Sequence, residues 1–120
     1  MRTITERIVL EDDWKLLAGD VYTVSPSEDN GGAINSNGHV ITTAAGDGIV
    51  LFEGNTTTAN GGAVYLQGAT SAHSIENALF QNNMATEGSA IYCDKQTVNI
   101  KDSIFSGNTS TQGGALAINA

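Results

Sequence analysis

The sequence is poor in several residue types, and each shortage excludes a class of protein. Only 5 of its 120 residues are Lys or Arg, against 13 Asp or Glu, which gives a formal net charge of −8 at pH 7. A chain this acidic has little attraction for the phosphates of nucleic acid or for anionic membrane surfaces. No apolar run approaches the roughly 18–20 residues of a membrane-spanning helix, so we expect no direct membrane insertion.

The chain has one cysteine and one proline. The lone Cys93 excludes an intrachain disulfide, and we interpret it as a small apolar residue of the core. The first residues lack the positively charged start and apolar segment of a secretory signal, so no signal peptide is predicted in this chain. Hydrophobic residues make up 40% of the sequence despite 14 glycines, which predicts a packed interior rather than disorder.

What the sequence does contain is a short repeat. A tetrapeptide of two small residues, Ala and an aliphatic residue begins at Gly31, Gly61, Gly88 and Gly113, at intervals of 30, 27 and 25 residues. A second motif, Phe-x-x-Asn, begins eight or nine residues before each of the last three copies, and consists of Phe52 with Asn55, Phe80 with Asn83, and Phe105 with Asn108. Two motifs that keep their phase over three periods identify a repeat protein.

The segments between the motifs are short, apolar and rich in β-branched residues. Examples are Val40-Ile41-Thr42-Thr43, Ile49-Val50-Leu51-Phe52 and Val98-Asn99-Ile100. Gly, Asn, Ser and Asp separate them, which is typical of strands joined by turns. A period of about 25 residues holds roughly three short strands. Coils of this kind stack about 4.8 Å apart, so the sequence predicts an all-β fold, a right-handed parallel β-helix of about four coils.

Aligning the copies predicts a structural role for each repeated residue. Phe52, Phe80 and Phe105 should stack as an internal aromatic ladder. Asn55, Asn83 and Asn108 should stack at a turn, where their amides bond to neighbouring coils. The small residues that open each tetrapeptide should form corners of the coil, and these are Gly31, Gly32, Gly61, Gly62, Gly88, Gly113 and Gly114. Ser89 replaces the second glycine of its pair, which indicates that this position does not require a positive φ.

Residues 1–30 differ from the repeats of residues 31–120, and we interpret them as an N-terminal cap of strand, short helix, strand and loop. Residues 11–18 predict the helix, because acidic residues open it, apolar residues share one face and Gly19 follows it. A β-helix needs its first coil covered, since an open end exposes apolar side chains and unpaired strand edges. We expect Trp14, Leu16 and Leu17 to provide that cover.

The paired motifs of residues 31–120 resemble the repeat of the chlamydial polymorphic outer-membrane proteins, whose autotransporter passenger domains are β-helical adhesins. The resemblance implies a surface or secreted module that belongs to a longer bacterial protein. It also implies an adhesin-like binding or display role, with a host-surface protein or glycan as partner.

Residue types that serve in catalytic or metal sites are scattered along the chain. Asp94 and Asp102 fall in one coil, but no carboxylate pair of the kind that glycoside hydrolysis needs recurs. His39 and His73 lie 34 residues apart without acidic or Cys partners at ligand spacing, so we expect both at the surface or at strand edges. We therefore expect no catalytic, cofactor or metal site, and no enzyme activity.

Two alternatives to a binding module remain open. The chain could be a fragment of a β-helical carbohydrate-active protein similar to polysaccharide lyases or hydrolases, which rests on fold analogy alone. It could also be a structural, self-assembling solenoid. Leu116 and Ile118 lie in the last predicted inner strand, and no further coil follows them in this sequence. We expect self-association through that uncovered C-terminal coil.

Overall fold

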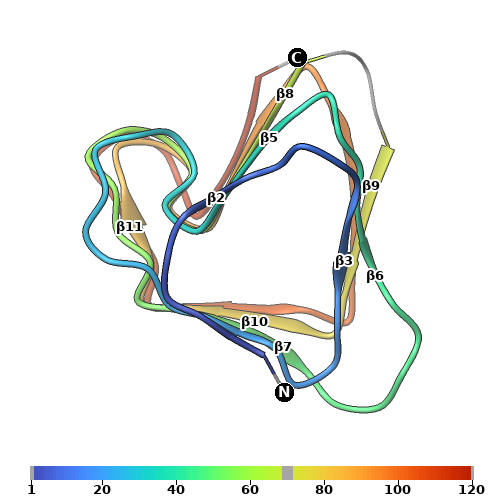
Figure 1. The fold of residues 1–120 in the computed structure, drawn as a ribbon. Coiled ribbons are helices and arrows are strands. Elements are labelled where there is room, and N and C mark those ends of the chain that lie inside the picture. Colours follow the sequence, from blue (N-terminus) through green and yellow to red (C-terminus); the bar gives the residue numbers. More distant parts are fainter. Residues whose placement is uncertain (1, 69–71, 120) are drawn as a thin grey trace.

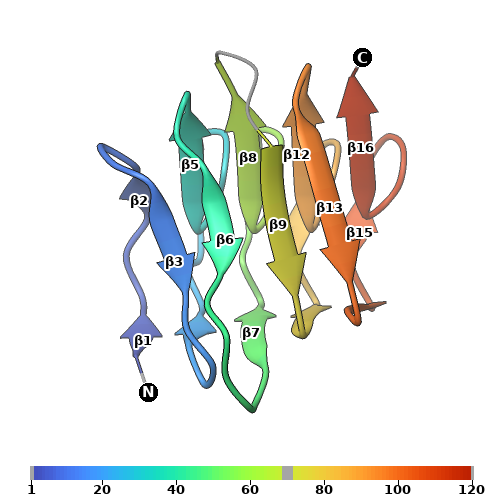
Figure 2. The ribbon, with the colours of Figure 1, turned by 90° about the vertical axis from the view of Figure 1, so that its right-hand side faces the viewer.

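The computed structural model describes residues 2–68 and 72–119, and within them every regular element is a β-strand. The expected all-β parallel solenoid of about four turns is confirmed. Figure 1 looks along its axis from the N-terminal end, and Figure 2 shows the coils side by side. The chain turns clockwise as it recedes from that end, which makes the coil right-handed. The described residues include no helix that could span a bilayer.

Three sheets form the walls of the solenoid, and each of the first four coils adds a strand to all three, whereas the last described coil adds a strand to the first and second only. The first sheet contains, in spatial order, β1 (Thr3–Ile4), β4 (Val21–Tyr22), β7 (Val50–Glu53), β10 (Ala78–Gln81) and β14 (Ile104–Ser106). The second contains β2 (Ile8–Val9), β5 (Ile34–Asn37), β8 (Val64–Gln67), β12 (Ile91–Asp94) and β16 (Leu116–Asn119). The third contains β3 (Trp14–Leu16), β6 (Ile41–Thr43), β9 (Ala72–Glu76) and β13 (Thr97–Lys101).

A lobe projects from the solenoid between the first and second sheets (Figure 1). It carries the short strands β11 (Met84–Ala85) and β15 (Thr109–Ser110), which pair with each other in parallel. Because the spatial order of strands follows the order of the chain, each coil rests on the coil before it.

The core lies inside the coil, and residues alternate between the interior and the outer face. In the second sheet Ile34, Val64 and Ile91 are in register and fully buried. Their inward position follows from the strand period of two, which places every second residue on the same face. Leu116 continues this column in β16 but is exposed, because no described strand lies on its far side.

The predicted N-terminal helix is wrong. Trp14, Lys15 and Leu16 form strand β3 and pair in register with Ile41, Thr42 and Thr43 of β6. The edge of β6 supplies backbone partners, whereas a helix of eight residues alone is marginal in water. The same pairing buries Leu16 completely. Strands β1, β2 and β3 thus form a first coil with one strand in each of the three sheets.

An aromatic ladder runs through the interior behind the first sheet. Neighbouring rings of Tyr22, Phe52, Phe80 and Phe105 are stacked with centroid distances of 4.7, 4.6 and 4.9 Å. Tyr22, Phe52 and Phe80 are fully buried. Tyr22 heads the ladder, although the sequence motif missed it because no Asn stands three residues after it.

We expect Phe80→Ala to lower the free energy of unfolding by about 3–5 kcal/mol, since it removes a ring packed on both faces. The control is Leu79→Ala, which truncates the half-buried neighbour on the outer face of the same strand. Thermal or urea unfolding measures both variants. Equal losses would show that the stacked ring contributes no more than a surface side chain.

Candidate functional site

The asparagines of the repeat form a continuous hydrogen-bonded column between coils. The side-chain amide of Asn83 donates to the carbonyl oxygen of Phe52 at 3.1 Å and to Oδ1 of Asn108 at 2.8 Å. Its own Oδ1 accepts from the backbone N–H of Asn55 and from Nδ2 of Asn55, both at 2.9 Å. Asn55 and Asn83 are buried, so each amide replaces water as the partner of turn backbone.

The column ends at Val24, just after β4 in the second coil. Val24 donates its backbone N–H to Oδ1 of Asn55 at 2.7 Å, as Asn55 does to Asn83. Val24 therefore occupies the position of the repeated asparagine with an apolar side chain. The sequence does not predict this equivalence, because the spacing from Tyr22 to Val24 is one residue shorter than the spacing from Phe52 to Asn55.

The two corner residues of each tetrapeptide meet different requirements. The first, exemplified by Gly61, has a φ of 72°, a conformation that favours glycine. The second, exemplified by Gly62, has no positive φ, but a Cβ there would collide with the carbonyl oxygen of Ser89 in the next coil. Ser89 itself is buried, and its hydroxyl has no hydrogen-bond partner within the described residues.

The N-terminal end of the aromatic ladder is held by a network of polar groups. Tyr22 accepts a hydrogen bond from Nε1 of Trp14 at 2.9 Å and donates its hydroxyl to Asp20 at 3.0 Å. Arg2 pairs with the same carboxylate through two nitrogens, at 3.0 and 2.6 Å. Its guanidinium also lies 4.9 Å from the centre of the Trp14 ring. This network supports the buried end of the ladder.

Asp20 is buried but remains ionised, paired with the guanidinium of Arg2. Burial pushes its pKa upward, but hydrogen bonds from Arg2, the backbone N–H of Leu17 and Tyr22 hold it below the ordinary value. Burial also raises the pKa of Tyr22, which keeps the phenol protonated. Of the three expected cap residues, Leu16 is fully buried and Trp14 half-buried, whereas Leu17 is 40% exposed.

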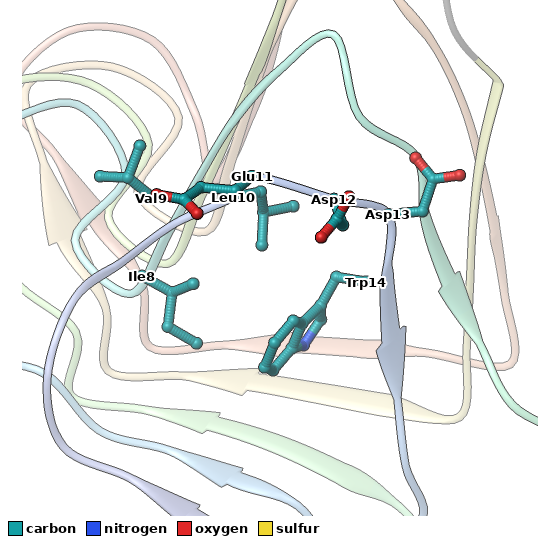
Figure 3. Close-up of a pocket in the computed structure, with 7 residues that line it drawn as sticks. All are labelled: Ile8, Val9, Leu10, Glu11, Asp12, Asp13 and Trp14. Atoms are coloured by element: carbon teal, nitrogen blue, oxygen red, sulfur yellow. The ribbon is translucent and has the colours of Figure 1, made fainter.

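A hollow of about 420 Å³ opens at this same end of the solenoid, in the turn between β2 and β3. Figure 3 shows Ile8, Leu10 and Trp14 directed into the coil, with Val9 directed away. Three exposed carboxylates form the rim, those of Glu11, Asp12 and Asp13. An apolar floor with an acidic rim suits an apolar group that carries a nearby positive charge.

The rim carboxylates are not equivalent. Asp13 accepts a hydrogen bond from the backbone N–H of Val40 at 2.8 Å, and its Oδ1 lies 3.9 Å from Nδ1 of His39. No such partner is recorded for Glu11 or Asp12 within the described part of the chain, which leaves them to solvent. A second open hollow, of about 510 Å³, lies on the lobe and is lined by Pro26, Ser27, Glu28, Asp29 and Thr58.

The expectation that His73 lies at the surface or a strand edge is wrong. His73 is fully buried in β9, at the same strand parity as Ile75. This parity was visible in the sequence as a signal of an inward side chain. Burial lowers the pKa of His73, and burial raises the pKa of the Cys93 thiol. Among residues 2–68 and 72–119, no three His, Cys, Asp or Glu side chains gather as metal ligands do.

These features define a parallel β-solenoid with internal Phe and Asn columns, a class of repeat protein whose coils build one continuous surface. A family profile, the Chlamydia polymorphic membrane protein repeat, matches residues 49–67, 77–94 and 102–119. The chain therefore carries three copies of this repeat. Each copy runs from the first sheet through the lobe to the second sheet, and omits the third.

Two curated proteins are similar to the chain. The "Probable autotransporter YfaL" of Escherichia coli (strain K12) is 34% identical over 92 residues, which is 72% of this chain and 7% of that protein. The "Probable outer membrane protein pmp6" of Chlamydia pneumoniae is 42% identical over 71 residues, which is 54% of this chain and 6% of that protein. The chain thus spans less than a tenth of either relative. No solved structure matches it.

We expect Asn83→Ala to destabilise the fold by about 1–3 kcal/mol, because it leaves the N–H of Asn55 and the carbonyl of Phe52 without their partner. Asn60→Ala is the matched control, since Asn60 lies outside the column and its hydrogen bonds to Asn30 and Gly31 use its backbone N–H and carbonyl. Chemical denaturation compares the two variants. Losses of the same size would show that the buried column does not hold the coils together.

Proposed function

We propose that the chain is a non-catalytic β-helical module of a longer bacterial surface or secreted protein, with an adhesin-like binding or display role. The observation that carries this proposal is the repeat, which the chain shares with proteins named as an autotransporter and an outer-membrane protein. Cell-surface exposure of the longer protein agrees with those two names. The partner in this proposal is a host-surface protein or a glycan.

The geometry supports binding in two ways. The stacked coils present repeated side chains on a continuous outer surface, which suits contact with an extended partner. The N-terminal hollow adds an apolar floor beside the free carboxylates of Glu11 and Asp12. A net charge of −8 favours the approach of a partner with a basic contact region.

The test is saturable binding of the labelled chain to cultured epithelial cells, measured by flow cytometry, with a glycan array in parallel. We expect saturable binding that the double variant Glu11→Lys/Asp12→Lys weakens. The control Asp47→Lys/Asp102→Lys makes the same change in net charge at two exposed residues that line neither hollow. Equal weakening by both variants would assign binding to overall charge. If neither assay shows saturable binding, the adhesin-like role is contradicted, and the display role is the part of the proposal that remains.

A second candidate, self-association, is favoured by the last coil. Leu116 and Ile118 are 39% and 61% exposed, and they continue the buried columns of Ile91 and Cys93. In β16, one edge pairs with β12, and the other edge has no described strand beside it. A second copy of the chain offers both an apolar surface and backbone partners of the required kind.

We expect the chain to associate as its concentration rises a hundredfold in sedimentation velocity experiments, and Leu116→Lys/Ile118→Lys to remain monomeric. Ile49→Lys/Met84→Lys is the control, because those side chains are about half exposed but lie away from the β16 edge. A single monomeric species for the unaltered chain at every concentration would contradict association through this coil.

A further inference from the structure

The third sheet has an unevenly paired junction in its middle. Strand β6 matches β3 through three residue pairs in register, and β9 matches β13 through five. Between β6 and β9 the described register has a single pair, Thr42 with Ser74. We call this contact the β6–β9 junction. It lies outside the segments that match the family repeat, so the repeated columns do not stabilise it directly.

Side chains supply hydrogen bonds across the β6–β9 junction. The backbone N–H of Ile41 donates to Nδ1 of His73 at 3.1 Å. The backbone N–H of Glu76 donates to Oγ1 of Thr43 at 2.9 Å. Of these two acceptors, only the imidazole of His73 changes its capacity to accept a hydrogen bond when it binds a proton near neutral pH.

The surroundings of His73 select one neutral tautomer. Because Nδ1 accepts from Ile41, the ring proton lies on Nε2, which donates to Oε1 of Gln96 at 3.2 Å. Gln96 is oriented for this role, since its Nε2 donates to the carbonyl oxygens of Gly68 and Lys95 at 3.0 and 3.2 Å. His73 is only 1% exposed, so water does not replace a lost partner.

The charged and titratable groups of the neighbouring elements offer an imidazolium little support. Asp13 of the first coil acts on His73 through its charge, but its carboxylate already accepts a hydrogen bond from the backbone N–H of Val40 and lies beside His39. Strand β6 has no titratable side chain. On β9 and β13, Glu76 and Lys101 lie at the outward parity. Near Gln96, Lys95 is exposed to solvent, and the thiol of Cys93 donates to the carbonyl oxygen of Gln96.

We propose that His73 makes the β6–β9 junction a proton-sensitive contact, which holds when the imidazole is neutral and opens when it binds a proton. Protonation places a second donor at Nδ1, facing the N–H of Ile41, and adds a charge to the core. Both effects remove the side-chain bond that substitutes for backbone pairing at this junction. The outcome is local separation of β6 from β9 in acid, while the first and second sheets remain paired.

The sign of the effect follows from linkage. Burial lowers the pKa of His73 in the folded protein below the ordinary 6.5, so the open state binds more protons than the closed state. The stabilisation of the closed junction is present above pH 6.5 and declines as the pH falls toward the folded pKa. For one coupled proton the opening equilibrium changes by up to about tenfold per pH unit.

Amide hydrogen exchange of Ile41 between pH 7.5 and 5, corrected for intrinsic exchange rates, tests the proposal. We expect the protection factor of Ile41 to fall by about tenfold as the pH drops. The amide of Ile34 is the internal reference, since it bonds a backbone carbonyl of the second sheet, that of Ala63. Constant protection of Ile41, or a parallel loss at Ile34, would overturn the proposal.

Two variants separate titration of His73 from general acid effects. His73→Asn keeps an oxygen acceptor near the position of Nδ1 but does not titrate, so Ile41 protection should become independent of pH. His39→Asn should keep the wild-type pH profile. An unchanged profile in His73→Asn would also overturn the proposal. If that variant does not fold, the NMR titration of the His73 ring in the unaltered chain decides, because a ring that titrates at its ordinary pKa contradicts the inference.

Discussion

The bond between each Asn side chain and the coil beside it is the interaction on which the register of this solenoid depends. One amide satisfies a carbonyl of the preceding coil and an Asn oxygen of the following coil, within a buried turn that water does not enter. A slip of one residue would remove these bonds and turn the aromatic ladder outward. The Phe stack and the Asn column therefore reinforce one register, and the three sheets follow it.

The two columns end differently in the second coil. The aromatic ladder finishes at Tyr22, whose hydroxyl meets Trp14 and the buried Asp20. The Asn column finishes at Val24, which needs no further amide partner. A buried carboxylate is tolerated there because Arg2, a backbone N–H and the phenol all donate to it. In this coil Tyr22 and Val24 thus stand at the positions that Phe and Asn occupy in the repeat.

The family repeat and the third sheet have different roles in this chain. The matched repeat supplies three of the five strands in each of the first and second sheets, together with the lobe strands between them. In the third sheet, side chains supply hydrogen bonds between β6 and β9: the imidazole of His73 and the hydroxyl of Thr43 each accept from a backbone N–H of the other strand. The third sheet and the N-terminal hollow thus lie outside the segments that match the family repeat.

The sequence by itself determined the solenoid, because motifs in constant phase require equivalent residues to stack. It also determined the inward columns, since a strand alternates its side chains with a period of two. Only the tertiary structure decided that Trp14–Leu16, within residues 11–18, form a strand rather than a helix. The edge of β6 offered them backbone partners, and this outweighed the local helical pattern. It also decided the equivalence of Val24 with Asn55 and the gathering of Ile8, Leu10 and Trp14 around one hollow. These depend on contacts between separate coils, and no local spacing in the chain encodes them.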